Sequence, residues 1–294
     1  MSSNPPRRRL RRVLLVLVVS ILVAAGVLWG VARYFLGTRV TPVVAARLQS
    51  AYGGPVHVGA ADIGLRSTSI RDVELFEPSP SASELPWIKI DAIHTDLSAW
   101  DLVRGKTSPG KLALEGPAVT LRIDKQGRLL TRLPHAETRQ LESVPGIEVK
   151  QGRISFLQED RPDFVLGGVD GSLRAEGERL LASGTISDPL WGQWTFSGWL
   201  DQRSHEWSAS LNTGHAVLTK QMLSSLPFIP LSVWQQVQID AGETAADITI
   251  RYDPVARQAH YRIQLKVQQT SLLVTAIGLA ADQAGGTVEI EDGL

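Results

Sequence analysis

Residues 261–267 read Tyr-Arg-Ile-Gln-Leu-Lys-Val, so that every second side chain is apolar. Successive side chains of a β-strand point to opposite faces of the sheet, and this alternation therefore predicts a strand with one apolar and one polar face. The same period recurs along most of the chain after Pro55. Apolar positions with this spacing include Val119, Leu121, Ile123, Phe196, Leu200, Ile248, Ile250, Tyr261, Ile263, Leu265 and Val267. The fold is predicted to be mainly β.

Two segments change the parity of their apolar residues. Ile147 and Val149 have odd numbers, whereas Ile154 and Phe156 have even numbers, and a similar change occurs within residues 88–97. One extra residue in a strand produces such a change, and it bends and twists the sheet. The strands follow one another closely with turn signals between them, which favours antiparallel meanders. We therefore expect a curved, twisted, groove-like antiparallel sheet.

One or two short helices accompany this sheet. Thr41 and Pro42 form a suitable N-cap and first turn for a helix over residues 43–52, which Gly53 would end. A second short helix is predicted at Thr219–Leu226, before Pro227.

An uncharged run, VLLVLVVSILVAAGVLWGVA, occupies residues 13–32. Twenty helical residues span roughly 30 Å, the thickness of a bilayer's hydrocarbon core. The run therefore predicts a transmembrane anchor over residues 13–36, containing Val13, Leu14, Leu15, Leu22 and Trp29. A cleaved signal peptide with its site near Val23-Ala24-Ala25 is the alternative, but its apolar region would usually be shorter.

Basic residues decide the predicted orientation of this anchor. The first twelve residues carry five arginines and no acid, namely Arg7, Arg8, Arg9, Arg11 and Arg12. Positive charge favours the cytoplasmic side. The prediction is a basic cytoplasmic tail (1–12), the anchor (13–36), a juxtamembrane helix (37–54) and a periplasmic β-rich domain (55–294), held in the inner membrane of a bacterium with two membranes.

Composition excludes several classes of function. Removing those five arginines from the thirty basic residues leaves twenty-five against thirty acidic ones, so the remaining chain is mildly acidic. Nucleic-acid binding needs a basic surface, and we expect none. The chain has no cysteine, which rules out thiol catalysis and cysteine-ligated zinc.

No motif predicts an enzyme, a metal site or a cofactor. The six histidines, His57, His94, His135, His205, His215 and His260, are scattered without metal-ligand spacing. Glu159, Asp160 and Asp163 flank Pro162, and a solvated turn is the better interpretation than a cation site. Gly167–Ser172 is rich in glycine but lacks the lysine and helix of a phosphate-binding loop, so a turn between strands is predicted there.

Several ordered segments together resemble the N-terminal part of AsmA-like proteins. They are the basic-flanked anchor, Leu48–Val58, Thr68–Leu75, Ile88–Ile93 leading into Asp96–Leu102, and Leu114–Leu121. AsmA/TamB-type proteins are anchored in the inner membrane and are similar in architecture to chorein-type bridge-like lipid-transfer proteins. Family members are usually much longer than this chain.

The resemblance implies a β-groove with an apolar inner face. Phospholipid acyl chains would lie against the eleven alternating residues named above, and the protein would support lipid transport or outer-membrane biogenesis without catalysis. The alternative is a membrane-tethered scaffold whose closed β-core docks another envelope protein, since apolar faces of sheets usually pack on a core. A periplasmic enzyme acting on glycan or lipid is the third reading.

Overall fold

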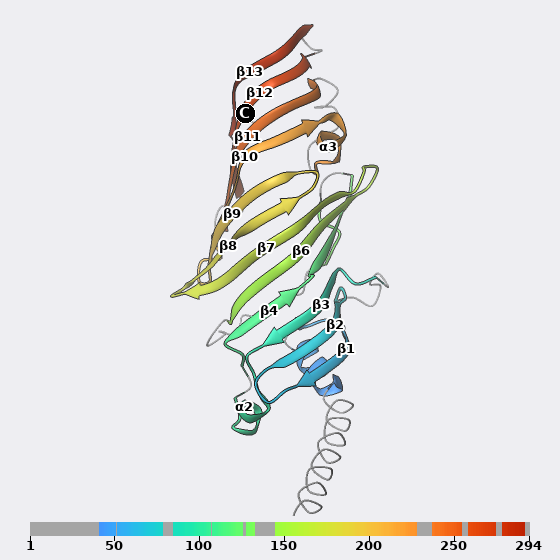
Figure 1. The fold of residues 1–294 in the computed structure, drawn as a ribbon, viewed down its shortest axis with the longest axis vertical. Coiled ribbons are helices and arrows are strands. Elements are labelled where there is room, and N and C mark those ends of the chain that lie inside the picture. Colours follow the sequence, from blue (N-terminus) through green and yellow to red (C-terminus); the bar gives the residue numbers. More distant parts are fainter. Residues whose placement is uncertain are drawn as a thin grey trace, which may run out of the picture.

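The computed structural model describes residues 41–50, 52–78, 85–106, 108–125, 128–132, 145–227, 237–254, 258–274 and 278–291. All thirteen strands of this part belong to one sheet, which confirms that the chain is mainly β (Figure 1). The strands are β1 (Val56–Ile63), β2 (Thr68–Leu75), β3 (Ile88–Thr95), β4 (Lys111–Glu115), β5 (Ala118–Ile123), β6 (Gly146–Gln158), β7 (Phe164–Glu176), β8 (Arg179–Asp188), β9 (Gly192–Asp201), β10 (Trp207–Thr219), β11 (Val237–Asp253), β12 (Gln258–Val274) and β13 (Leu279–Glu291).

Strand order follows the sequence from β1 to β13 with one local exception. β4 and β5 both lie between β3 and β6, and both pair with β6 in parallel. The predicted meander is therefore wrong at this step. The sequence period marks which residues are extended, but it does not determine which strands pair or in which direction.

A glycine joins β4 and β5 into one bent strand. Gly116 has a φ of 61°, and a Cβ on it would lie 2.0 Å from a carboxylate oxygen of Asp91. Its N–H donates to the carbonyl of Lys150 on β6. The left-handed backbone and the close approach of Asp91 both require glycine here.

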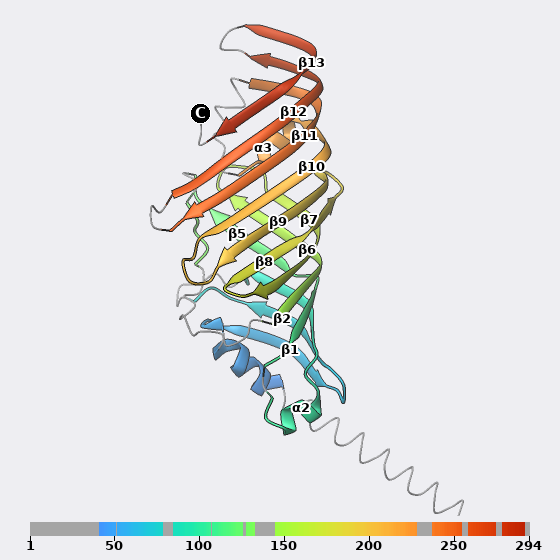
Figure 2. The same cartoon turned by 90° about the vertical axis from the view of Figure 1, so that its left-hand side faces the viewer.

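Irregular residues bend the sheet, as the parity changes predicted. Gln151 in β6 has a φ of 55°, and the β6–β7 register shifts between Val149 and Gly152. Further shifts lie between Thr213 and Ala216 in β10 and in the pairs β11–β12 and β12–β13. Bulges of this kind bend the bulged strand and increase its twist. Figure 2 shows the result, a sheet bent along its length so that it has a concave and a convex side.

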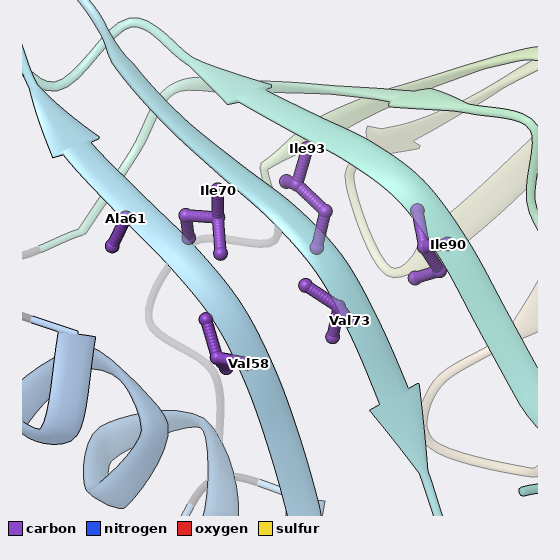
Figure 3. Close-up of a cluster of buried hydrophobic side chains, with 6 residues drawn as sticks. All are labelled: Val58, Ala61, Ile70, Val73, Ile90 and Ile93. Carbon is purple, nitrogen blue, oxygen red and sulfur yellow. The ribbon is translucent and has the colours of Figure 1, made fainter.

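The closed core of the molecule lies at its N-terminal end (Figure 3). It is formed by six buried side chains of β1–β3: Val58, Ala61, Ile70, Val73, Ile90 and Ile93. The predicted helix is present over residues 41–50, and its Val44, Ala45 and Leu48 cover this cluster. The helix ends as expected at Gly53, whose φ is 79° and whose N–H donates to the carbonyl of Gln49.

Two further helices are short. α3 (Lys220–Ser225) confirms the predicted helix, with the Thr219 hydroxyl accepting a hydrogen bond from the Met222 N–H as N-cap. α2 (Ala99–Val103) was not predicted from the apolar period, because it makes barely more than one turn. Helix 41–50 and α3 both lie on the concave side of the sheet (Figure 2).

The prediction of a turn at Gly167–Ser172 is wrong, because these residues lie inside β7. Gly168 has a φ of 61°, and a Cβ on it would lie 2.3 Å from the carbonyl oxygen of Ser187 on β8. The glycines therefore permit close approach between paired strands, a role that composition does not distinguish from that of a turn.

The predicted tail and anchor, residues 1–36, lie outside the described residues. Among the helices that the structure does describe, none has the length and apolar character needed to cross a membrane.

Candidate functional site

A row of register partners crosses the sheet without a polar side chain. Partners across strands place their side chains on the same face. The row, which we call the apolar row, contains Ala61, Ile70, Ile93, Leu114, Val149, Gly171, Gly184, Phe196, Leu211, Ile248, Ile263 and Ile290. It takes one residue from each of twelve strands. One face of the sheet is therefore apolar from the first strand to the last, and helix 41–50 identifies this face as the concave one.

The neighbouring row is polar over almost its whole length. It contains Asp62, Ser69, His94, Ala113, Glu148, Ser172, Ser183, Ser197, Ser210, Thr249, Arg262 and Glu291, and we call it the polar row. Its members precede or follow those of the apolar row in the chain, so they lie on the convex face. Apart from Ala113 on β4, the apolar and polar rows stay segregated along the path from β1 to β13.

The eleven residues predicted to line the apolar face come together on it. Three belong to the apolar row, and others lie two residues along the same strands, such as Ile250, which follows Ile248 and pairs with Ala209 and Tyr261. Ten of the eleven are partly exposed. Ile123 is the exception, with 0% exposure, so it serves packing at the end of β5.

Packing differs between the two ends of the apolar face. At β1–β3 the side chains form the closed core under helix 41–50. From β6 to β12 most apolar side chains of this face are only partly buried. All described strands belong to the one sheet, so within the described residues no second sheet covers them. Large contiguous apolar surfaces that stay partly exposed are typical of interaction sites.

Aromatic side chains shape the middle of this face. The Phe196 ring lies over two glycines of neighbouring strands, and its Cζ is 2.8 Å from the position of a Cβ on Gly171 and 2.6 Å from that on Gly184. A second aromatic group lies on β6, β7 and the β8–β9 turn: the Phe164 ring is tilted against Phe156 and Trp191, with centroids 5.8 and 5.0 Å away. The Phe196 ring fills the space that Gly171 and Gly184 leave, so the face stays continuous there.

The convex face carries charged and hydroxyl side chains instead. Lys89 pairs with Glu74 at 3.0 Å and Arg262 with Glu291 at 2.8 Å, while hydroxyls dominate between β7 and β11. Three shallow depressions of about 300, 700 and 170 Å³ lie here, lined mainly by polar side chains such as Ser183, Ser197 and Ser210. The largest and the smallest of the three also have residues of the apolar row along their lining, namely Val149, Gly171 and Gly184 in the largest and Phe196, Leu211 and Ile248 in the smallest.

One buried polar cluster was not predicted from the sequence. Glu77, two residues after the end of β2, is only 4% exposed. Its carboxylate accepts from the Arg122 guanidinium at 2.5 Å and from the Arg132 N–H at 3.3 Å. Arg122 N–H in turn donates to the Thr131 hydroxyl at 2.7 Å. The cluster fixes the segment after β5 to the segment after β2, which no local pattern signals.

Groups suited to catalysis do not converge in the described part of the chain. His94 lies 3.4 Å from Glu115 and His215 lies 3.9 Å from Glu243, and both pairs are exposed. Asp160 sits in the β6–β7 turn, as predicted, beside Lys125 at 2.5 Å. Among these residues, no group of three histidines, aspartates or glutamates is arranged to hold a metal ion.

The chain matches no protein-family model and no curated protein with which it was compared.

Proposed function

We propose that this chain is a non-enzymatic, inner-membrane-anchored envelope protein of the AsmA-like type. Its concave apolar face binds or guides phospholipid acyl chains in the periplasm, and the protein thereby supports lipid transport or outer-membrane biogenesis. The observation that carries this proposal is the apolar row, which runs across twelve strands and is only partly buried from β6 to β12.

The energetics of acyl-chain binding favour this function. Each methylene removed from water contributes about 0.8 kcal/mol, so a two-tailed lipid gains many times the thermal energy from such a face. The polar row on the other face keeps the convex side in water, and lipid headgroups remain free to extend past the strand ends.

Adjacent residues of β11 provide the test. A photo-crosslinking amino acid is placed at Ile250, on the apolar face, and separately at Thr249, on the polar row, in the full chain expressed in a bacterium with two membranes. After irradiation, adducts are identified by mass spectrometry. Phospholipid adducts at Ile250 and none at Thr249 are expected. Equal labelling at both positions, or protein adducts alone at Ile250, would overturn the proposal.

A tethered scaffold with a closed β-core remains the second candidate, because the β1–β3 end of the sheet is closed in this way. It differs from lipid binding in its expected adducts: crosslinks at Ile250 would then lead to another envelope protein.

A further inference from the structure

Three large apolar side chains stand out at the N-terminal end of the sheet. Leu65 in the β1–β2 turn is 70% exposed, and Trp100 and Val103 of α2 are 62% and 78% exposed. Three exposed basic residues lie close to them in the chain: Arg66 follows Leu65, Arg104 follows Val103, and Lys106 lies two residues further on. We call these six residues the α2 patch.

Hydrogen bonds join α2 and the segment before it to the β1–β2 turn and to β2. The Ala99 N–H donates to the carbonyl of Gly64 at 3.0 Å, which holds α2 against the β1–β2 turn. The Thr68 hydroxyl donates to the carbonyl of Leu97 at 2.8 Å. α2 lies at the end of the molecule formed by β1–β3 (Figure 1).

The N-terminus of α2 is capped reciprocally, which stabilises this short helix. The Asp101 carboxylate accepts from the Ser98 N–H at 3.0 Å and from the Ser98 hydroxyl at 2.6 Å, and the Asp101 N–H donates back to that hydroxyl at 3.1 Å. This capping box fixes the helix. Trp100 and Val103 are three residues apart, so they lie on the same side of it.

The composition of the α2 patch identifies the surface that it fits. An apolar protein partner would favour a patch without flanking charge, whereas this one combines a tryptophan, two aliphatic residues and three cations. Tryptophan prefers the headgroup level of a bilayer, and lysine and arginine beside it are attracted to anionic lipids. The nearest acid in the helix, Asp101, is already engaged in the cap.

We infer that the α2 patch inserts into the headgroup layer of an anionic lipid bilayer and forms a membrane contact separate from the apolar run at residues 13–32. Leu65, Trp100 and Val103 enter the interface, and the three basic side chains contact lipid phosphates. This contact fixes the tilt of the sheet relative to the membrane. It does not depend on whether the concave face carries lipid.

The absence of cysteine makes the test direct. Val103→Cys in the full chain is labelled with a fluorophore, and the protein is reconstituted into phosphatidylcholine vesicles with or without phosphatidylglycerol, using brominated lipids as quenchers. Leu190→Cys, in the β8–β9 turn and 59% exposed, is the matched control. We expect strong quenching at position 103 in the anionic vesicles and none at position 190.

A charge variant separates membrane contact from other causes of quenching. The double variant Arg104→Gln, Lys106→Gln keeps the apolar side chains of the α2 patch. Each basic residue near an anionic membrane surface contributes roughly a factor of five to binding, so the ratio of membrane-inserted to non-inserted α2 patch should fall about thirtyfold. Equal quenching at positions 103 and 190, or quenching unaffected by anionic lipid and by the charge variant, would overturn the inference. A label shielded without lipid, in a concentration-dependent manner, would instead show contact between copies of the chain.

Discussion

A pair of charge substitutions separates an open apolar face from a closed core. Val73 is 1% exposed in the β1–β3 cluster, whereas Ile263 in the apolar row is partly exposed. Both side chains are replaced by glutamate in the full chain. If the two ends of the face differ as their burial indicates, the first substitution unfolds the domain and the second does not.

The expected magnitudes follow from burial. Val73→Glu forfeits about 1.5 kcal/mol or more of apolar transfer and leaves a carboxylate without a partner in the core, which costs several kcal/mol more. The total, about 4 kcal/mol or more, approaches the whole stability of an ordinary domain. At Ile263 the new carboxylate can turn toward solvent, so only part of the transfer term is lost, about 1 to 2 kcal/mol.

Urea unfolding of the detergent-solubilised chain, followed by circular dichroism, measures the change in stability of both variants. Mass spectrometry of extracted lipid measures the amount of bound phospholipid. Thr249→Glu, on the polar row beside Arg262, is the control and should change stability by no more than about 0.5 kcal/mol. Ile263→Glu should remain folded and lose bound phospholipid. If Ile263→Glu destabilises the chain as much as Val73→Glu does, the face is a closed core and the interpretation fails.

Three other predictions concern packing and hydrogen bonding. Gly184→Ala places a methyl group 2.2 Å from a backbone oxygen and 2.6 Å from the Phe196 ring, so it should cost about 2 kcal/mol in a urea titration; unchanged stability would mean that the ring does not lie there. Tyr52→Phe removes the hydrogen bonds to the Phe76 carbonyl at 2.7 Å and from Trp87 at 2.6 Å, at a cost of about 1 kcal/mol. Burial raises the pKa of the Tyr52 hydroxyl above 10.0. The contribution of this hydroxyl to the free energy of unfolding is therefore complete below pH 10.0 and is lost as the pH rises through the raised pKa. A melting temperature that falls equally with alkali in the wild-type chain and in Tyr52→Phe would contradict this. Glu77→Gln leaves the half-exposed Arg122 without a counter-charge and should lower the stability, measured by thermal denaturation, by about 1 to 3 kcal/mol. Unchanged stability would show that the ion pair does not stabilise the fold.

The sequence predicted those features of the fold that depend on local alternation. The strands around Ile250 and Ile263, the irregularity near Gln151 and the helix at Thr219–Leu226 follow from side-chain period and capping residues, which act within a few positions of the chain. The short helix α2 carried a usable signal, the Ser98 and Asp101 capping box, although its apolar period was too short to detect.

Features that depend on distant partners could not be predicted in the same way. Parallel pairing of β4 and β5 with β6 leaves no mark on the period of either strand. Gly168 and Gly184 are required by backbone or rings from neighbouring strands, and Glu77 is buried by a guanidinium 45 residues away. The same limit applies to the candidate site: alternation predicted which side chains share a face, but the full burial of Ile123 depends on how its neighbours pack.

Because the strand order follows the sequence, the length of the sheet depends directly on the number of hairpins in the chain. The path from β1 to β13 contains eleven steps between neighbouring strands, each about 4.8 Å, which amounts to roughly 50 Å. Because each strand is held chiefly by the two beside it, inserting or deleting one hairpin changes the reach by roughly 10 Å while the remaining ladder keeps its pairing. The length of such a sheet can therefore change by duplication or loss of hairpins, without redesign of the β1–β3 core.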